Sequence, residues 1–252
     1  MSEQNDSSLN FDFSFAFQPI VDVRAREIFS YEALIRGTSQ EPARWVLENV
    51  LPEEMAAFDR KARNHAINLA CRLGVDCHLN LNYMPQGHDS PAVSILMMLT
   101  EAGRHNFPID RLVLEVTETG VIENPALFAE LVNRYRASGL KVAIDDFGAG
   151  YSGLNLLVDL QPDQLKLDMK LVRGIDTHGP RQAIVRAIRQ ACDDLGIDVI
   201  AEGVETEQEY AWLVNEEIHL FQGFLFAKPG FESLPDVHFP GTPSSPVSDI
   251  RI

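Results

Sequence analysis

Short apolar segments rich in β-forming residues alternate with amphipathic segments along most of the chain. From the third apolar segment on, the intervening stretches carry helix signals, including the Asn124-Pro125 start, the Thr206-x-x-Glu209 capping box and stops at Gly74, Gly139 and Gly196. This alternation predicts a parallel β-sheet with helical crossovers. The strands are expected at eight runs: Phe15–Ile20, Ile28–Leu34, Cys77–Asn82, Leu112–Val116, Lys141–Asp145, Leu165–Asp168, Asp198–Glu202 and His219–Gln222.

Eight strands with helical crossovers in 252 residues fit an α/β fold of the TIM-type (β/α)8 barrel class. An open doubly wound sheet fits less well, since it usually carries a glycine-rich dinucleotide-binding turn, and we expect no Gly-x-Gly-x-x-Gly turn in this chain. The first two strands depart from the regular barrel, because only Val21–Glu27 lies between them and a parallel crossover needs about a dozen residues. We therefore predict a modified barrel with one antiparallel strand.

The domain boundaries follow from composition. We predict a disordered N-terminal segment over residues 1–10, a barrel over 11–234 and a flexible tail rich in Pro and Ser over 235–252. The first segment lacks the features of a signal peptide, and the longest apolar run, Val93–Leu99, is too short to span a bilayer. Three cysteines without a Cys-x-x-Cys pair favour a cytoplasmic protein.

Hydrophobic residues make up 45% of the chain and charged residues 23%, as in ordinary globular proteins. The net charge is -16, which disfavours binding to a nucleic-acid polymer or to an anionic membrane, because both require basic surface. A phosphate-bearing substrate would therefore need cations supplied locally.

Polar side chains recur at or near the ends of the apolar runs, and that edge of a barrel holds the active site. A core strand has no packing reason to finish on a carboxylate, because an unpaired buried charge is costly. Hard divalent cations prefer carboxylate and carboxamide oxygens, and the absence of His and Cys from the set argues against zinc. The residues are Glu32, Asn82, Glu115, Asp145, Lys166, Glu202 and Gln222.

The adjacent Asp145 and Asp146 could bridge or divide two cations, whose spacing in two-metal sites is about 3.5–4 Å. Five carboxylates would leave one cation with much uncompensated negative charge, whereas two cations would balance it. Lys166 then suits the orientation of an attacking water or the compensation of phosphate charge. The residues thus predict a metal-dependent phosphodiesterase.

Six motifs follow one another along the chain: Tyr31-Glu32-Ala33-Leu34-Ile35-Arg36, Leu114-Glu115-Val116-Thr117-Glu118, Asp145-Asp146-Phe147-Gly148, Leu165-Lys166-Leu167-Asp168, Ala201-Glu202-Gly203-Val204-Glu205 and Gln222-Gly223. In this order they resemble the EAL-domain cyclic di-GMP phosphodiesterases, and the resemblance runs from about Phe17 to Pro229. It implies cleavage of cyclic di-GMP to linear pGpG with two Mg²⁺ or Mn²⁺ ions, inhibition by Ca²⁺, and a homodimer formed through the barrel.

The resemblance also implies roles for individual residues. The metal ligands would be Glu32, Asn82, Glu115, Asp145, Asp146 and Glu202, and the catalytic residues Lys166, Glu202, Asp146 and Gln222. Substrate contacts would come from Gln18, Leu34 and Arg36, while Glu118 and Asp168 would stabilise the loop after the aspartate pair.

Two places depart from the usual family pattern. The segment Leu79-Asn80-Leu81-Asn82 offers two asparagines on one face of a strand, of which we favour Asn82 as the ligand, with Asn80 as the alternative. Ala149 and Gly153 stand where hydroxyl residues are common, which places the control of that loop in question. A sensor domain in a longer parent chain would fit the family.

Other interpretations remain open at this stage. Glu32, Glu202 or Lys166, taken singly, would be better explained as a solvated strand end. The aspartate pair, taken alone, fits a turn or helix cap about as well as a functional role. Arg36 could serve as a surface ion-pair partner. A catalytically silent cyclic di-GMP receptor is the main functional alternative. A barrel glycosidase with two carboxylates is the second, and it would need neither metal nor Lys166.

Overall fold

A computed structural model describes residues 11–84, 91–117, 125–150 and 153–241 of the chain. The strands are β1 (Phe13–Asp22), β2 (Glu27–Gly37), β3 (His78–Tyr83), β4 (Leu112–Thr117), β5 (Lys141–Phe147), β6 (Gln164–Leu167), β7 (Asp198–Ala201), β8 (Leu220–Phe221) and β9 (Gly230–Phe231). The α-helices are α1 (Ala43–Glu48), α2 (Met55–Leu73), α3 (Pro91–Arg104), α4 (Pro125–Arg136), α5 (Gly153–Leu160), α6 (Met169–Val172), α7 (Gly179–Leu195) and α8 (Glu207–Asn215).

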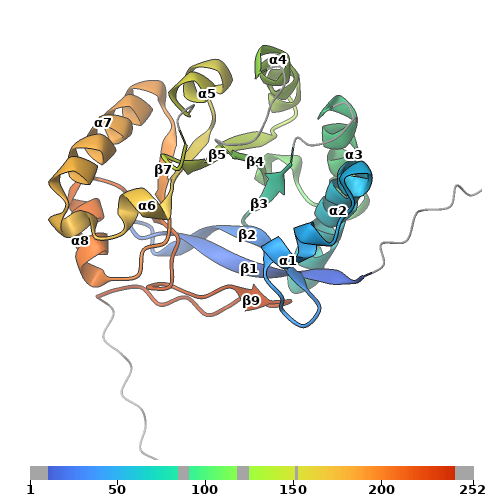
Figure 1. Ribbon diagram of the computed structural model, residues 1–252, viewed down its shortest axis with the longest axis horizontal. Coiled ribbons are helices and arrows are strands. Elements are labelled where there is room, and N and C mark those ends of the chain that lie inside the picture. The colour runs from blue at the N-terminus through green and yellow to red at the C-terminus, as the bar shows by residue number, and fades with distance from the viewer. Residues whose placement is uncertain (1–10, 85–90, 118–124, 151–152, 242–252) are drawn as a thin grey trace, which may run out of the picture.

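The sheet closes on itself. Neighbouring strands run β2-β3-β4-β5-β6-β7-β8-β1, and β1 also pairs with β2, which completes the barrel. The pairs from β2 to β8 are parallel, whereas β1 is antiparallel to both of its barrel neighbours. The predicted barrel with one antiparallel strand is thus confirmed. Figure 1 shows the helices arranged around the strands, with β1 and β2 side by side.

Two apolar regions hold the barrel together. The larger lies between the sheet and the helices, where outward-facing residues such as Leu114 and Val116 pack among helical residues such as Ile67. The smaller consists of Ile20, Ile200 and Leu220, and strand alternation places it inside the barrel, on the same strand faces as the predicted site residues. The polar side chains inside the barrel therefore lie above an apolar plug.

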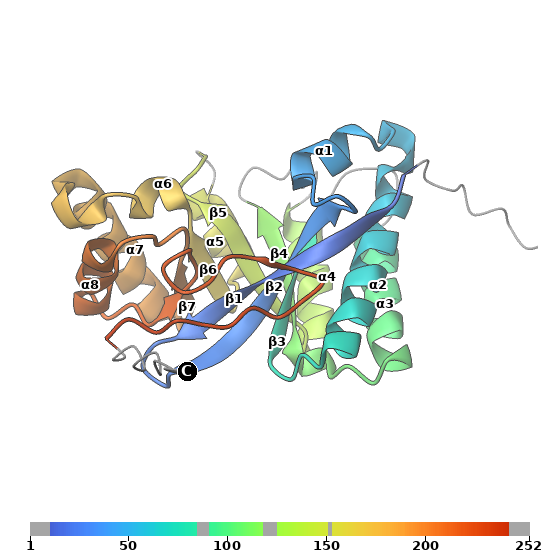
Figure 2. The ribbon, with the colours of Figure 1, turned by 90° about the horizontal axis from the view of Figure 1, so that it is seen from below.

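The C-terminal part of the described chain covers the hairpin of β1 and β2. The strand β9, which the sequence does not predict, pairs with β1, and Figure 2 shows this segment crossing both hairpin strands. Residues 235–241 belong to the predicted tail, yet His238 donates its backbone N–H to Phe226, and Val237 and Phe239 pack against the core. This segment takes the place of a covering helix.

One argument for the barrel needs correction. The glycine spacing of a dinucleotide-binding turn does occur in the chain, at Gly148-x-Gly150-x-x-Gly153. It follows β5 and begins two residues after the aspartate pair Asp145-Asp146, whose charge would repel a pyrophosphate. Closure of the sheet, rather than the lack of such a turn, therefore distinguishes the barrel from the open sheet. No helix in the described ranges is long and apolar enough to cross a bilayer.

Candidate active site

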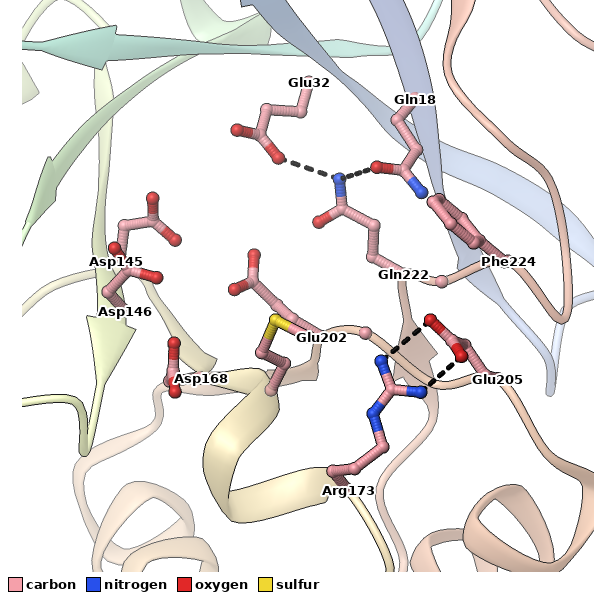
Figure 3. Close-up of a pocket in the computed structure, with 13 residues that line it drawn as sticks. Gln18, Glu32, Asp145, Asp146, Asp168, Arg173, Glu202, Glu205, Gln222 and Phe224 are labelled. Carbon is pink, nitrogen blue, oxygen red and sulfur yellow. Dashed lines mark hydrogen bonds and ion pairs between the residues drawn. The ribbon is translucent and has the colours of Figure 1, made fainter. Parts of the chain in front are cut away.

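The polar side chains identified from the sequence meet at the carboxyl ends of β2 to β8. A cavity of about 270 Å³ opens there, lined by Gln18, Glu32, Asp145, Asp146, Asp168, Met169, Arg173, Glu202, Gly203, Glu205, Gln222, Gly223 and Phe224. Figure 3 shows the two aspartates on one side of this cavity, Glu32 and the glutamines on the other, and Glu202 between them. Glu115 and Lys166 lie deeper and are fully buried.

Lys166 is the centre of the charge cluster. Its Nζ lies 2.6 Å from Glu202 Oε1, 2.8 Å from Glu115 Oε1, 3.0 Å from Asp145 Oδ1 and 3.1 Å from Glu32 Oε2. Burial acts to lower the pKa of Lys166, but the four carboxylates outweigh it and raise that pKa well above its usual value. Lys166 is therefore a permanent cation that holds the four acidic side chains together.

One ammonium cannot balance the acidic groups around it. With Asp146 included, five carboxylates against Lys166 leave an excess of four negative charges when all are ionised. Burial, followed by neighbouring carboxylates, raises the pKa of Glu115 and Glu202 well above the usual range despite the attraction of Lys166. The cluster therefore favours either protonation or the arrival of further cations.

Asp145 and Asp146 face the cavity together because the strand is irregular at that point. Successive side chains of a regular strand point to opposite faces. The register of β5 against β6 shifts between Ile144 and Phe147, and Asp146 has a φ of 55°, in the left-handed region that non-glycine residues rarely adopt. This bulge presents two consecutive carboxylates to one site, a local strain of the kind that clusters at functional sites.

Asp168 contacts Asp146, one member of this pair. Its carboxylate accepts a hydrogen bond from Lys170 N at 2.8 Å as the N-cap of α6, and it also lies against Asp146. Burial, then the charge of Asp145, then Asp168 raise the pKa of Asp146 to about 6. Asp146 therefore titrates close to physiological pH in the absence of a bound cation.

Three amide side chains surround Glu32. Asn82 Nδ2 donates to Glu32 Oε1 at 3.2 Å, and Gln222 Nε2 donates to Glu32 Oε2 at 2.8 Å. Gln18 donates its Nε2 to Ala227 O at 3.2 Å, and its Oε1 lies 3.4 Å from Gln222 Nε2. Although burial opposes it, Lys166 together with Gln222 and Asn82 lowers the pKa of Glu32, which is therefore held ionised.

Gln222 owes its position to the glycine that follows it. A Cβ on Gly223 would lie 2.1 Å from Val204 O and 2.4 Å from Val204 N, so only glycine allows these backbones to touch. The contact is completed by Val204 N donating to Gln222 O at 3.1 Å. The Gln222-Gly223 dipeptide therefore fixes β8 against the segment after Glu202.

The remaining predicted residues are less central in this structure. Leu34 and Arg36 continue the inner face of β2 beyond Glu32, but neither lines the cavity, and Arg36 Nη1 donates to Ile35 O at 2.7 Å. Glu118 lies outside the described residues. Ala149 donates its N–H to Asp146 O at 3.0 Å in the turn after the bulge, and Gly153 begins α5.

Sequence reasoning missed one wall of the cavity. Arg173 and Glu205 form a two-point ion pair there, with Arg173 Nη2 2.7 Å from Glu205 Oε1. Next to it lies Phe224, whose ring is 53% exposed and has Lys228 Nζ 5.6 Å from its centroid. The sequence signal that could have identified this wall is the aromatic residue Phe224 directly after the Gln222-Gly223 motif.

The residues present fit divalent cations. Two sets of three acidic residues each bring their carboxylate oxygens within 4.8 Å of one another. The first set is Glu32, Glu115 and Asp145, and the second is Asp145, Asp146 and Glu202. Asp145 belongs to both, and Glu115 Oε2 is buried without a hydrogen-bond partner among the described residues. Oxygen-only donor sets that share an aspartate suit two hard cations rather than zinc.

The closed barrel and its acidic centre define a TIM-type barrel protein whose acidic cluster, at the carboxyl ends of its strands, fits divalent cations. Residues 2–229 match the family model of the EAL domain. The chain belongs to the EAL domain family.

Relatives of known sequence agree. The chain is 35% identical over 227 residues to the blue light- and temperature-regulated antirepressor BluF of Escherichia coli, covering 90% of the chain and 56% of BluF. It is 35% identical over 170 residues to the cyclic di-GMP phosphodiesterase RocR of Pseudomonas aeruginosa, covering 67% of the chain and 42% of RocR. The chain thus spans about half the length of these relatives.

Solved structures share the fold. A standalone versatile EAL protein from Vibrio cholerae O395 in its c-di-GMP bound form has a TM-score of 0.87 at 44% identity, covering 92% of this chain and 98% of that one. The manganese and cyclic di-GMP complex of Klebsiella pneumoniae BlrP1 at pH 9.0 has a TM-score of 0.83 at 37% identity, covering 92% of this chain and 59% of BlrP1.

Proposed function

We propose that this protein hydrolyses one phosphodiester bond of cyclic di-GMP to give linear pGpG, using two divalent cations, Mg²⁺ or Mn²⁺. The observation that carries the proposal is the buried cluster of four carboxylates around Lys166, joined by Asp146 through the bulge of β5. Relatives named cyclic di-GMP phosphodiesterases and a neighbour solved with manganese and this nucleotide support it.

Each residue has a defined task in this proposal. Glu32, Asn82, Glu115, Asp145, Asp146 and Glu202 would hold the cations, whose chemistry when bound is to compensate charge on phosphoryl oxygens and to lower the pKa of a water. Lys166 keeps the carboxylates in place and stays protonated. Gln222 orients Glu32 and, with Gln18, lines the side of the cavity next to Phe224.

Electrostatics explains why the reaction would depend on metal. A cyclic dinucleotide carries two negative phosphates, and the protein has a net charge of -16. The guanidinium that lines the cavity, Arg173, is already paired with Glu205. Cations bound to the cluster would therefore supply the positive charge that attracts the substrate.

Further expectations from the family extend the proposal. Ca²⁺ should inhibit, because it favours more ligands at longer distances than Mg²⁺ or Mn²⁺. Cyclic di-GMP is the expected partner, and a homodimer through the barrel and a sensor domain in a longer parent chain belong to the same proposal. The exposed Leu154 and Val158 on α5 provide apolar surface for a dimer contact.

A cyclic di-GMP receptor without turnover is the second candidate. It is favoured by BluF, a relative that matches 90% of the chain and is named an antirepressor rather than a hydrolase. A receptor needs the pocket but not the metal ligands. The glycosidase alternative gains no support, since it assigns no task to Lys166, which is ion-paired to both Glu32 and Glu202.

The decisive experiment incubates purified protein with cyclic di-GMP and Mn²⁺ and separates the products by chromatography. We expect pGpG, its loss in EDTA, and a fall of at least about 100-fold in kcat for Asp146→Asn, an effect of about 2.7 kcal/mol on the barrier. Asp193→Asn, which removes a carboxylate from α7 far from the cavity, should react normally. Tight binding without product would establish the receptor instead, and product formation in EDTA would exclude the two-metal mechanism.

A further inference from the structure

A pair of amides lies inside the barrel, on the same strand faces as the carboxylates. Asn80 on β3 is 0% exposed and Gln164 on β6 is 1% exposed. Burying an amide without hydrogen bonds costs about 1–3 kcal/mol, so further polar side chains inside a barrel need a reason. The plug of Ile20, Ile200 and Leu220 in the same interior shows that apolar side chains can fill it.

Asn80 contacts a single carboxylate closely. Its Nδ2 donates to Glu115 Oε1 at 2.9 Å, and the same nitrogen lies 3.5 Å from Gln164 Oε1. Lys166 Nζ reaches the same Glu115 oxygen at 2.8 Å. Because a carboxylate oxygen can only accept, the amide must face Glu115 with its nitrogen.

These contacts make the two oxygens of Glu115 unequal. Oε1 is held by two donors, while Oε2 is buried and has no hydrogen-bond partner among the described residues. A carboxylate clamped through one oxygen presents the other in a fixed direction. Glu115 is also placed to ligate a cation, because one of its carboxylate oxygens lies within 4.8 Å of an oxygen of Glu32 and an oxygen of Asp145.

The two asparagines of β3 therefore differ in task. Asn82 lies opposite Glu115 in the β3–β4 ladder and donates to Glu32, at the level of the carboxylates. Asn80 lies one layer deeper, opposite Val113, and its Oδ1 has no hydrogen-bond partner among the described residues. Asn80 supports a ligand from a deeper position on the strand, whereas Asn82 is itself one of the proposed ligands.

We propose that Asn80 is a positioning residue that sets the orientation of Glu115 for cation binding, with Gln164 as its backing. This inference rests on the proposed metal site. Residues that orient metal ligands in this way typically change metal affinity by about 10- to 100-fold when removed. Asn80 does not touch the substrate cavity, so its removal should leave the contacts to the nucleotide intact.

The test measures Mn²⁺ binding directly, by electron paramagnetic resonance or calorimetry on the full chain without substrate. Asn80→Ala should weaken the binding of Mn²⁺ by about 10- to 100-fold. Asn80→Val, which keeps more volume and suits a strand, should give the same result if the alanine variant folds poorly. In active protein at saturating Mn²⁺, the KM for cyclic di-GMP should not change.

The control is Leu81→Ala, on the same strand but facing the helices, which lowers stability without touching Glu115. It should retain the wild-type affinity for Mn²⁺. Normal Mn²⁺ binding by a folded Asn80 variant would overturn the inference and leave the proposed function intact. If Leu81→Ala weakened Mn²⁺ binding as much as Asn80→Ala, the effect of Asn80 would be one of packing, and the inference would also be overturned. Wild-type protein that binds no Mn²⁺ would overturn both.

Discussion

Replacing Lys166 by methionine tests whether one buried ammonium holds the carboxylate cluster together. The substitution keeps an unbranched side chain but removes the charge that lies within 3.1 Å of four carboxylates. Breaking a buried ion pair on one side costs about 3–5 kcal/mol, because the partner charge stays buried. In a domain of this size each kcal/mol shifts the melting temperature by about 2–4 °C, so we expect a loss of about 6–20 °C.

The assay is thermal unfolding in EDTA at pH 8, compared with the same protein in excess Mg²⁺ or Mn²⁺. Bound cations replace part of the missing charge, so the deficit of the variant should shrink when metal is present. Lys170→Met, on the exposed surface of α6, is the matched control and should melt like wild type. An unchanged melting temperature for Lys166→Met in EDTA would refute the reasoning, because the cluster would then not depend on its ammonium.

Two further predictions concern pH and substrate. The pKa of Asp146 is raised to about 6, first by burial and then by Asp145. Between about pH 4 and 6, Asp146 is therefore protonated in the folded protein but ionised in the unfolded chain. The stability that Asp146 contributes to the metal-free protein therefore falls as the pH rises through this range. Because the ionised carboxylate is the form that binds a cation, titrations should show tighter binding of Mn²⁺ at pH 7 than at pH 5. Equal affinities at the two pH values would contradict this prediction. Phe224→Ala should raise the KM for cyclic di-GMP by about 10-fold, since stacking of one base on an aromatic ring is worth about 1–3 kcal/mol, while Phe224→Tyr should not. The affinity for Mn²⁺ is the control measurement, and a fall in Mn²⁺ binding by Phe224→Ala would show that the variant disturbs the metal site rather than base stacking.

Local patterns in the chain were enough to predict the barrel. Apolar runs and helix signals specify strands and helices through contacts between near neighbours, and the short link from Val21 to Glu27 already requires an antiparallel pair. Parallel strands in a closed barrel end at one edge, so polar residues at strand ends were bound to meet there. The local patterns did not predict β9, whose partner is far away in sequence, since it pairs with β1 across more than two hundred residues.

What only the tertiary structure decided is how these side chains are arranged once they meet. The bulge that turns Asp145 and Asp146 to the same side depends on the register of β5 against β6. The division of work between Asn80 and Asn82 depends on which carboxylate each faces, and the wall of Arg173, Glu205 and Phe224 joins segments after different strands. Sequence determines which groups reach the barrel edge, because strand periodicity is local. Their hydrogen bonds, charges and exposed oxygens are set by neighbours from other strands, and those exist only in the closed barrel.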